Sequence, residues 1–326
     1  MPKIIKYEYN SSLAPHIATL IEEKRALGFI YNNEAGILRR FDDYWKARGF
    51  DDRITQERLM EWCAKTDTEG CKSLSNRVVA ISQFCKYLSS FGEDVHIPHL
   101  DIRIEKPVVH VLSATEIKEL FDAIDSYRPV NRDPAYIRMA ESYRVIFRLI
   151  LCLGTRLNET RMIRIEDVDL EKASVRLLET KGQKQRVLCL NDDLKKLLSD
   201  HMSYLNTALC HQPKWLFPGY DPNQPVSKGT VDKRFRISWG LTSFAGKTEK
   251  DPTVHSLRWT FIMQRLLQWQ KEGTDRNAML PYLLKHLGHK TLDETYYYFK
   301  LIQEKAADAV ANDKTARYVI PEVGAR

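Results

Sequence analysis

Hydrophobic residues over the first hundred positions recur every three or four residues, the spacing found on the buried face of an α-helix. Four such stretches predict a small helical bundle. Gly28, Gly49 and Gly92 stand near the ends of three stretches, where helices commonly terminate. The apolar positions of the four stretches are Leu13, Ile17, Leu20, Ile21 and Leu27; Ile37, Leu38, Phe41, Tyr44 and Trp45; Leu59, Met60 and Trp62; and Leu74, Val78, Ile81, Phe84, Cys85 and Leu88.

The helical pattern breaks between residues 97 and 107. Pro98 and Pro107 each bias the preceding residue away from helical geometry. The length of 326 residues also suits two domains better than a single core. We therefore expect a helical domain over 1–106, a linker near 97–107 and a second domain over 107–326.

The second domain begins with a predicted helix, because Ser113 and Glu116 have the spacing of a capping box. Residues 143–153 predict a buried helix. The period then shortens, and two strands are expected at Ser174–Glu179 and Arg186–Leu190, joined by a turn over 181–184. Helices return after residue 190, with two more between 255 and 287, whereas 211–250 shows no clear pattern. The fold class predicted is mainly α with a small β-sheet (α+β).

Composition and charge narrow the class of protein without identifying it. Hydrophobic residues make up 43% and charged residues 29%, which is ordinary for a globular protein. The net charge is +7; residues 1–106 hold 16 basic and 16 acidic side chains, so the surplus lies in the remainder, with 34 and 27. This balance permits a polyanionic partner without proving one. Neither a signal peptide nor a membrane-spanning run is apparent, so we expect a cytoplasmic protein.

The six cysteines form no CxxC pair, and most stand in apolar stretches. We expect reduced thiols packed as small hydrophobic side chains, and no structural zinc site.

Several short motifs in the second domain carry groups suited to phosphate chemistry. Arg156 follows a buried helix and a glycine, and Glu159 lies three residues on, close enough to brace it. By itself this pair could be a surface salt bridge. Lys181 stands at the tip of the predicted hairpin and could reach into a groove, although lysines are common in turns. His255 and Arg258 share one helix face, where an anion between them would relieve their repulsion.

Two further motifs follow near the C-terminus. His289 comes after Leu287-Gly288 and would project from the end of a helix, although a lone histidine there is usually surface; His286 is expected to be structural. The run Tyr296-Tyr297-Tyr298-Phe299 could be core packing or could supply a nucleophilic hydroxyl, and the residues alone do not say which tyrosine.

Taken in order, Arg156, Lys181, His255, Arg258, His289 and Tyr298 resemble the Arg–Lys–His–x–x–Arg–His–Tyr signature of the tyrosine recombinase (phage integrase) family. The match includes the local sequences around each group and covers residues 113–300 closely. It is weaker over 10–90, where Asn76-Arg77 ahead of residues 84–88 looks like the last helix of the family's core-binding domain. Asn158 stands where serine is common, and Trp259 where histidine is common.

The resemblance implies a SAM-like core-binding domain followed by a catalytic domain with a C-terminal helix. The family's spacing selects Tyr298 as nucleophile. Arg156, Arg258 and His289 would bind the scissile phosphate, His255 would act as base, and Lys181 would protonate the leaving 5′ oxygen. The product would be a 3′-phosphotyrosine and a free 5′ hydroxyl. No cofactor is expected, and no acidic cluster able to hold two metal ions is apparent in the sequence.

The expected partner is a double-stranded DNA recombination site, clamped between the two domains. Arg77 and Lys86 are candidate DNA contacts, although Arg77 could be a solvated helix charge. Leu301, Ile302, Ala306 and Val310 could pack on their own domain, or could dock on a neighbouring protomer in a homo-tetramer on two DNA sites, with a monomer off DNA. We expect a nucleoid-associated integrase or transposase of a mobile element. The alternatives are a type IB topoisomerase-like nicking-closing enzyme and a non-catalytic architectural DNA-binding protein; a metal-dependent nuclease lacks ligands.

Overall fold

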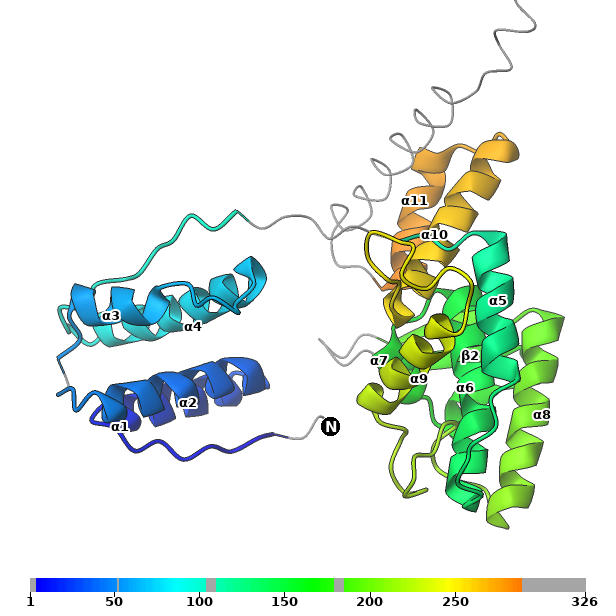
Figure 1. Ribbon diagram of the computed structural model, residues 1–326, viewed down its shortest axis with the longest axis horizontal. Coiled ribbons are helices and arrows are strands. Elements are labelled where there is room, and N and C mark those ends of the chain that lie inside the picture. The colour runs from blue at the N-terminus through cyan, green and yellow to red at the C-terminus, as the bar shows by residue number, and fades with distance from the viewer. Residues whose placement is uncertain (1–3, 52, 104–109, 179–184, 289–326) are drawn as a thin grey trace, which may run out of the picture. The chain divides into compact units, whose positions relative to one another are not determined.

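The computed structural model describes residues 4–51, 53–103, 110–178 and 185–288 (Figure 1). The chain divides into two compact units, residues 1–107 and 108–326. Each unit has its own hydrophobic core and is described by itself.

The first unit consists of four helices in its described part. They are α1 (Ala14–Ala26), α2 (Asn32–Ala47), α3 (Gln56–Cys63) and α4 (Cys71–Ser89). Aromatic rings meet at its centre, where Phe41 lies 5.3 Å from Trp45 and 5.5 Å from Trp62, measured between ring centroids. The four predicted helical stretches are confirmed. Leu27 does not belong to the buried face: it follows the last residue of α1, and 72% of the residue is exposed.

Arg77 lies inside the first unit, which argues against its assignment as a DNA contact and against a solvated helix charge. Its guanidinium donates to both carboxylate oxygens of Glu69, at 3.1 and 2.5 Å, and to the carbonyls of Trp62 and Ala64. Only 7% of the residue is exposed, and its guanidinium is held by groups of the first unit. The hydrogen bond and charge of Arg77 also hold the pKa of Glu69 below its usual range. Lys86 is exposed on the same helix, and its role stays a prediction.

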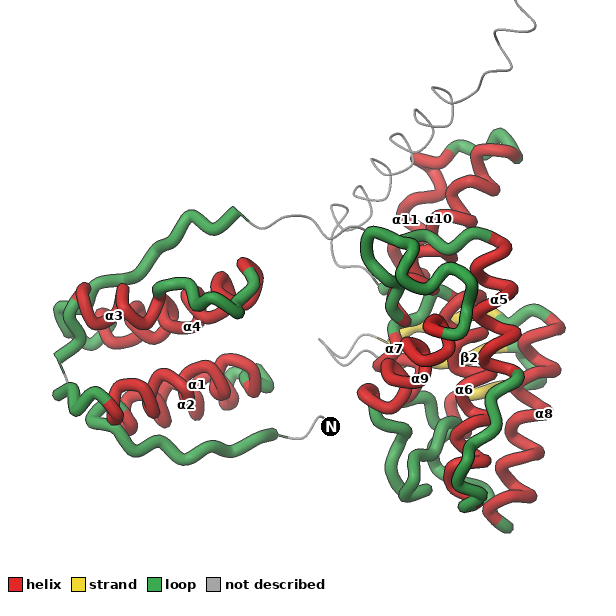
Figure 2. The backbone as a smooth tube through the Cα atoms, in the orientation of Figure 1, coloured by secondary structure: helices red, strands yellow, loops and turns green. Residues whose placement is uncertain are grey.

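The second unit is mostly helical around a small sheet (Figure 2). The long helix α6 packs against four other helices of the described part, α5, α7, α8 and α10. In its described part the elements are α5 (Ala114–Asp125), α6 (Pro134–Leu153), α7 (Leu157–Arg161), a 3₁₀ turn (Ile165–Asp167), β1 (Val168–Asp169), β2 (Ser174–Leu178), β3 (Gln185–Cys189), α8 (Asp192–Leu209), α9 (Lys228–Gly240), α10 (Val254–Lys271) and α11 (Arg276–Leu287).

The sheet is antiparallel in the order β1-β2-β3, and β2 pairs with β3 in the register Val175 to Leu188. Both of these side chains are buried, so one face of the hairpin packs on the core. The two predicted strands are confirmed to within one residue at each boundary. The turn that contains Lys181 lies outside the described residues. The capping box at Ser113 and Glu116 is present, as predicted.

All six cysteines are free thiols, but the expected packing is wrong for four of them. Only Cys63 and Cys85 are buried; Cys71, Cys152, Cys189 and Cys210 are exposed. An apolar stretch does not guarantee burial, because Cys152 falls on the outward face of the amphipathic helix α6. Among the described residues, the structure has no helix with the length and apolar character needed to cross a bilayer.

Candidate active site

Arg156 lies between two helices, at the point where α6 has ended and α7 begins. The preceding Gly154 takes the left-handed conformation, with φ of +62°, which ends α6 and turns the chain. Glu159 accepts hydrogen bonds from the backbone N–H and from Nη1 of Arg156, both at 2.8 Å. Nη2 of Arg156 donates to the Gly288 carbonyl at 3.1 Å. Glu159 thus contacts Arg156 as the sequence predicts, and fixes the direction of its guanidinium.

Arg258 reaches the same place from α10. Its side chain is buried, with 1% of the residue exposed. Nη1 donates to the Gly154 carbonyl at 2.6 Å, and Nη2 donates to the Leu287 carbonyl at 2.8 Å. Nη1 also lies 4.0 Å from Oε2 of Glu159. The two arginines predicted to bind one phosphate therefore approach one carboxylate, although they are separated by about a hundred positions in sequence.

His255 lies in the first turn of α10, whose start is fixed by a capping box between Thr253 and Ser256. The imidazole keeps a solvent-exposed surface and meets Trp259 edge-on, with ring centroids 5.4 Å apart. Desolvation by the surrounding protein, followed by the charges of Arg258 and Arg156, lowers the pKa of His255 to about 4. The neutral form, which can accept a proton, therefore prevails at neutral pH.

Glu159 is ionised at the centre of this arrangement. Burial acts to raise its pKa, but hydrogen bonds and charge from Arg186, and then from Arg156, outweigh burial and lower the pKa to about 2. Arg186, on β3, donates to Oε1 at 3.2 Å and to Oε2 at 2.8 Å. Arg186 was not among the site residues predicted from the sequence. A signal was present, because Arg186 alternates with the buried Leu188 and so shares its inward face.

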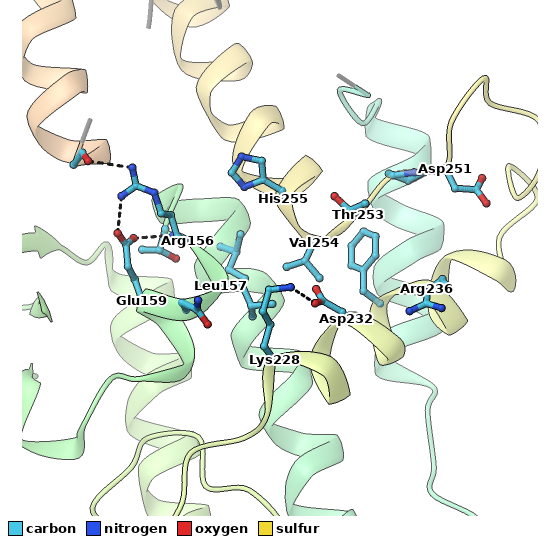
Figure 3. A pocket seen from close by; sticks show the side chains of 16 residues that line it. Arg156, Leu157, Glu159, Lys228, Asp232, Arg236, Asp251, Thr253, Val254 and His255 are labelled. Atoms are coloured by element: carbon cyan, nitrogen blue, oxygen red, sulfur yellow. Dashed lines mark hydrogen bonds and ion pairs between the residues drawn. The ribbon is translucent and has the colours of Figure 1, made fainter. Parts of the chain in front are cut away.

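A pocket of about 1060 Å³ opens beside these groups. Figure 3 shows Arg156 and His255 on one side of it, with Lys228, Asp232 and Arg236 contributed by α9. Lys228 is paired with Asp232. Within the ranges that the structure describes, no cluster of three or more His, Cys, Asp or Glu side chains could hold a metal ion.

Three predicted site residues, Lys181, His289 and Tyr298, lie outside the described residues. Arg258 and Arg156 donate to the carbonyls of Leu287 and Gly288, the two residues that precede His289 in the sequence. His286 binds the Leu153 carbonyl through Nε2 at 2.8 Å and stacks on Phe261.

Comparison with known proteins finds relatives that are recombinases and integrases. Residues 110–305 match the phage integrase family. The chain is 24% identical to the tyrosine recombinase XerA of Pyrococcus horikoshii over 320 residues, which cover 95% of this chain and 96% of XerA. It is 23% identical over 295 residues to y4rB of Sinorhizobium fredii, named as a candidate integrase/recombinase, covering 88% and 92% of the two chains.

Solved structures share the fold. XerH bound to a palindromic difH substrate, in a post-cleavage complex, aligns with a TM-score of 0.64 and 19% identity, covering 93% of this chain and 84% of XerH. The Tn1549 transposon integrase, in complex with a circular-intermediate DNA, aligns with a TM-score of 0.60 and 15% identity, covering 87% and 94%.

Proposed function

Because this chain belongs to the phage integrase family, and is thus a tyrosine recombinase, we propose that Arg156, Arg258 and His255 act with Lys181, His289 and Tyr298 on one DNA phosphate. The observation that carries this proposal is the meeting of Arg156 and Arg258 at Glu159, beside the imidazole of His255. Two fixed guanidiniums in a partly enclosed site stabilise the charge that develops on a phosphate.

The proposed reaction begins when the phenolic oxygen of Tyr298 attacks the phosphorus. A bond forms between Tyr298 and the 3′ phosphate, and the bond from phosphorus to the 5′ oxygen breaks. The tyrosine proton passes to His255, which is neutral in the free protein, and Lys181 supplies a proton to the departing 5′ oxygen. Attack by the 5′ hydroxyl of a partner strand reverses these steps, and the ester keeps the bond energy, so no ATP is consumed.

The arginines supply most of the charge stabilisation in this scheme. A phenol has a reference pKa of about 10, so it needs a base and a positive environment to react at neutral pH. Removing one preorganised donor from such a site typically costs about 3–4 kcal/mol of transition-state stabilisation. Arg156 and Arg258 should each be nearly indispensable.

The biological setting is the second part of the proposal. The first unit would close on a double-stranded site as a clamp, with exposed basic residues such as Lys86 neutralising phosphates. Residues after Tyr298 would dock on a neighbouring protomer, giving a homo-tetramer on two sites. We place the protein in the cytoplasm on the nucleoid, as an integrase or transposase of a mobile element. The names of the similar proteins, which include integrases and a transposon integrase, support this choice.

A nicked suicide duplex tests the chemistry, because the cleaved fragment diffuses away and traps the covalent intermediate. The site is first obtained by selecting duplexes that the wild-type protein retains. We expect a protein–DNA adduct that survives denaturant and EDTA and maps to Tyr298. Tyr298→Phe should bind the duplex and form no adduct. An adduct on Tyr296 or Tyr297, or one that needs a metal ion, would refute the assignment.

Lys181 is tested separately with a leaving group that needs no proton. Lys181→Ala should cleave a normal duplex poorly and should regain activity on a 5′-phosphorothiolate, because a thiolate leaves without protonation. Arg156→Ala provides the matched control, since a lost phosphate contact is not repaired by a better leaving group. Equal impairment of Lys181→Ala on both duplexes would remove Lys181 as the general acid.

A further inference from the structure

Three consecutive carbonyls at the end of α11 each accept a hydrogen bond from a different arginine. The last carbonyls of a helix have no partner within the helix, and this end carries partial negative charge, so cations stabilise it. The three pairs are Arg186 Nε with the His286 carbonyl at 2.7 Å, Arg258 Nη2 with the Leu287 carbonyl at 2.8 Å, and Arg156 Nη2 with the Gly288 carbonyl at 3.1 Å.

Arg156 and Arg258 are the proposed phosphate ligands, whereas Arg186 has no role in the proposed reaction so far. Arg186 comes from β3, and its side chain is only 10% exposed. Its Nε donates to the His286 carbonyl of α11, and its two terminal nitrogens donate to the carboxylate of Glu159. Every nitrogen of its guanidinium thus makes a contact inside the protein, and its Nε, unlike that of a phosphate ligand held by its terminal nitrogens alone, is fixed on α11. We therefore assign Arg186 to the support of the site and not to the phosphate.

The contacts of Arg186 control where the Glu159 carboxylate points. Oε1 of Glu159 is shared between Nη1 of Arg156 and Arg186, and Oε2 accepts from Arg186 while lying 4.0 Å from Arg258. Without Arg186, the buried carboxylate would lose two charge-assisted hydrogen bonds and would turn toward the remaining guanidiniums. The catalytic arginines would then be neutralised by Glu159 in place of the phosphate.

We propose that Arg186 is a positioning residue for DNA cleavage, acting through Glu159 and the end of α11 to hold Arg156 and Arg258 in place. This role rests on the proposed function, because it assumes that the two arginines act on the scissile phosphate. A planar guanidinium is suited to the task, since one side chain reaches a carboxylate and a carbonyl from fixed directions.

Arg186→Met tests this role, because it removes the charge and keeps an apolar stem of similar length. Two quantities are measured: the single-turnover rate of adduct formation on saturating suicide duplex, and the Kd for the same duplex. We expect the rate to fall about 30-fold, by analogy with outer-shell partners of metal ligands, whose loss typically costs about 10–100-fold. The Kd should change by less than about threefold, because Arg186 is proposed not to touch DNA. Arg176→Met, an exposed arginine on β2, is the matched control and should keep the wild-type rate.

Glu159→Gln and the double variant show whether Arg186 acts through Glu159. In the Glu159→Gln background, adding Arg186→Met should slow cleavage by no more than about threefold, because residues in one network are not additive. If Arg186→Met does not fold, Arg186→Lys carries the test: it keeps the charge, loses the fork, and should still slow cleavage about tenfold.

The possible failures are distinct. Three outcomes would overturn the role of Arg186 alone. The folded Arg186 variant could cleave at the wild-type rate, or its affinity for DNA could fall as much as its rate. The double variant could also show a rate loss equal to the product of the two single losses. If the wild-type protein itself forms no adduct on the selected duplex, the proposed function falls and this role falls with it.

Discussion

The ring of Phe261 occupies the space that a side chain on Gly154 would need. A Cβ atom added to Gly154 would lie 2.3 Å from Cδ1 of the phenylalanine, and the glycine has a φ of +62°. The carbonyl of the same glycine accepts the hydrogen bond from Nη1 of Arg258. The close approach of α10 to the end of α6 thus sets the position of Arg258, a proposed phosphate ligand.

Gly154→Ala should therefore impair both folding and catalysis. The left-handed conformation costs a non-glycine residue about 1 kcal/mol, and overpacking against Phe261 adds about 1–3 kcal/mol. We expect a loss of about 2–4 kcal/mol in the free energy of unfolding, measured by urea denaturation of the full chain. The rate of adduct formation should fall as well, because the Gly154 carbonyl must move.

Gly273→Ala is the matched control, since Gly273 also follows a helix with φ of +67° and has nothing within 4 Å of an added Cβ. It should lose only about 1 kcal/mol and keep its cleavage rate. Equal losses in the two variants would show that Phe261 does not restrict position 154.

Arg77→Met should destabilise the first unit and should not change which DNA sequence the protein prefers to bind. It leaves the partly buried Glu69 without its main partner. Breaking a fully buried ion pair typically costs about 3–5 kcal/mol, so we expect a loss somewhat below that range. Urea denaturation measures the loss, and Arg77→Met/Glu69→Gln should recover part of it.

Lys86→Met is the control on the same helix. We expect normal stability, and a salt dependence of DNA binding reduced by about one phosphate contact. Normal stability of Arg77→Met would contradict the buried network.

Local sequence patterns were sufficient for most elements of the fold. The helices of the first unit and the hairpin followed from the 3.6- and 2-residue periods, because one face of each element packs on a core. The helix α9 was missed, since only Val231, Phe235, Ser238 and Trp239 of its thirteen residues are buried and basic side chains interrupt the pattern.

The site depended on contacts that no local pattern contains. Arg77 is at helical spacing from the buried Leu74 and Ile81, but a charged side chain is not expected inside. Only its contacts with Trp62, Ala64 and Glu69, which precede α4, show how it is accommodated there. For Arg186 the alternation with Leu188 indicates the inward face of the hairpin, but only the fold shows that Glu159 lies beside it. The resemblance to a family supplied the order of the reacting groups, whereas their supporting partners required three-dimensional contacts.

Cleavage activity should be lost on acidification only at a pH well below the usual pKa of a histidine. His255 must be neutral to accept a proton, so activity is lost as pH falls through its pKa, which is about 4 in the free protein. The profile of kcat/KM reports free-enzyme groups. We expect it to stay level from about pH 8 down to about pH 5, whereas an unperturbed histidine would lose activity near pH 6.5. His255→Gln, assayed alongside, should be slow and insensitive to pH in this range. A tenfold fall centred near pH 6.5 in the wild type would contradict the neutral base.

A crystal structure of Tyr298→Phe bound to an intact, selected site tests most directly whether the six side chains meet on one phosphate. We predict that the guanidiniums of Arg156 and Arg258 both lie about 3 Å from non-bridging oxygens of the same phosphate. The ring of residue 298 should lie opposite the 5′ oxygen, with Lys181 near that oxygen. Guanidiniums that face different phosphates, or a ring at position 298 packed in an apolar core away from the DNA, would contradict the proposed site.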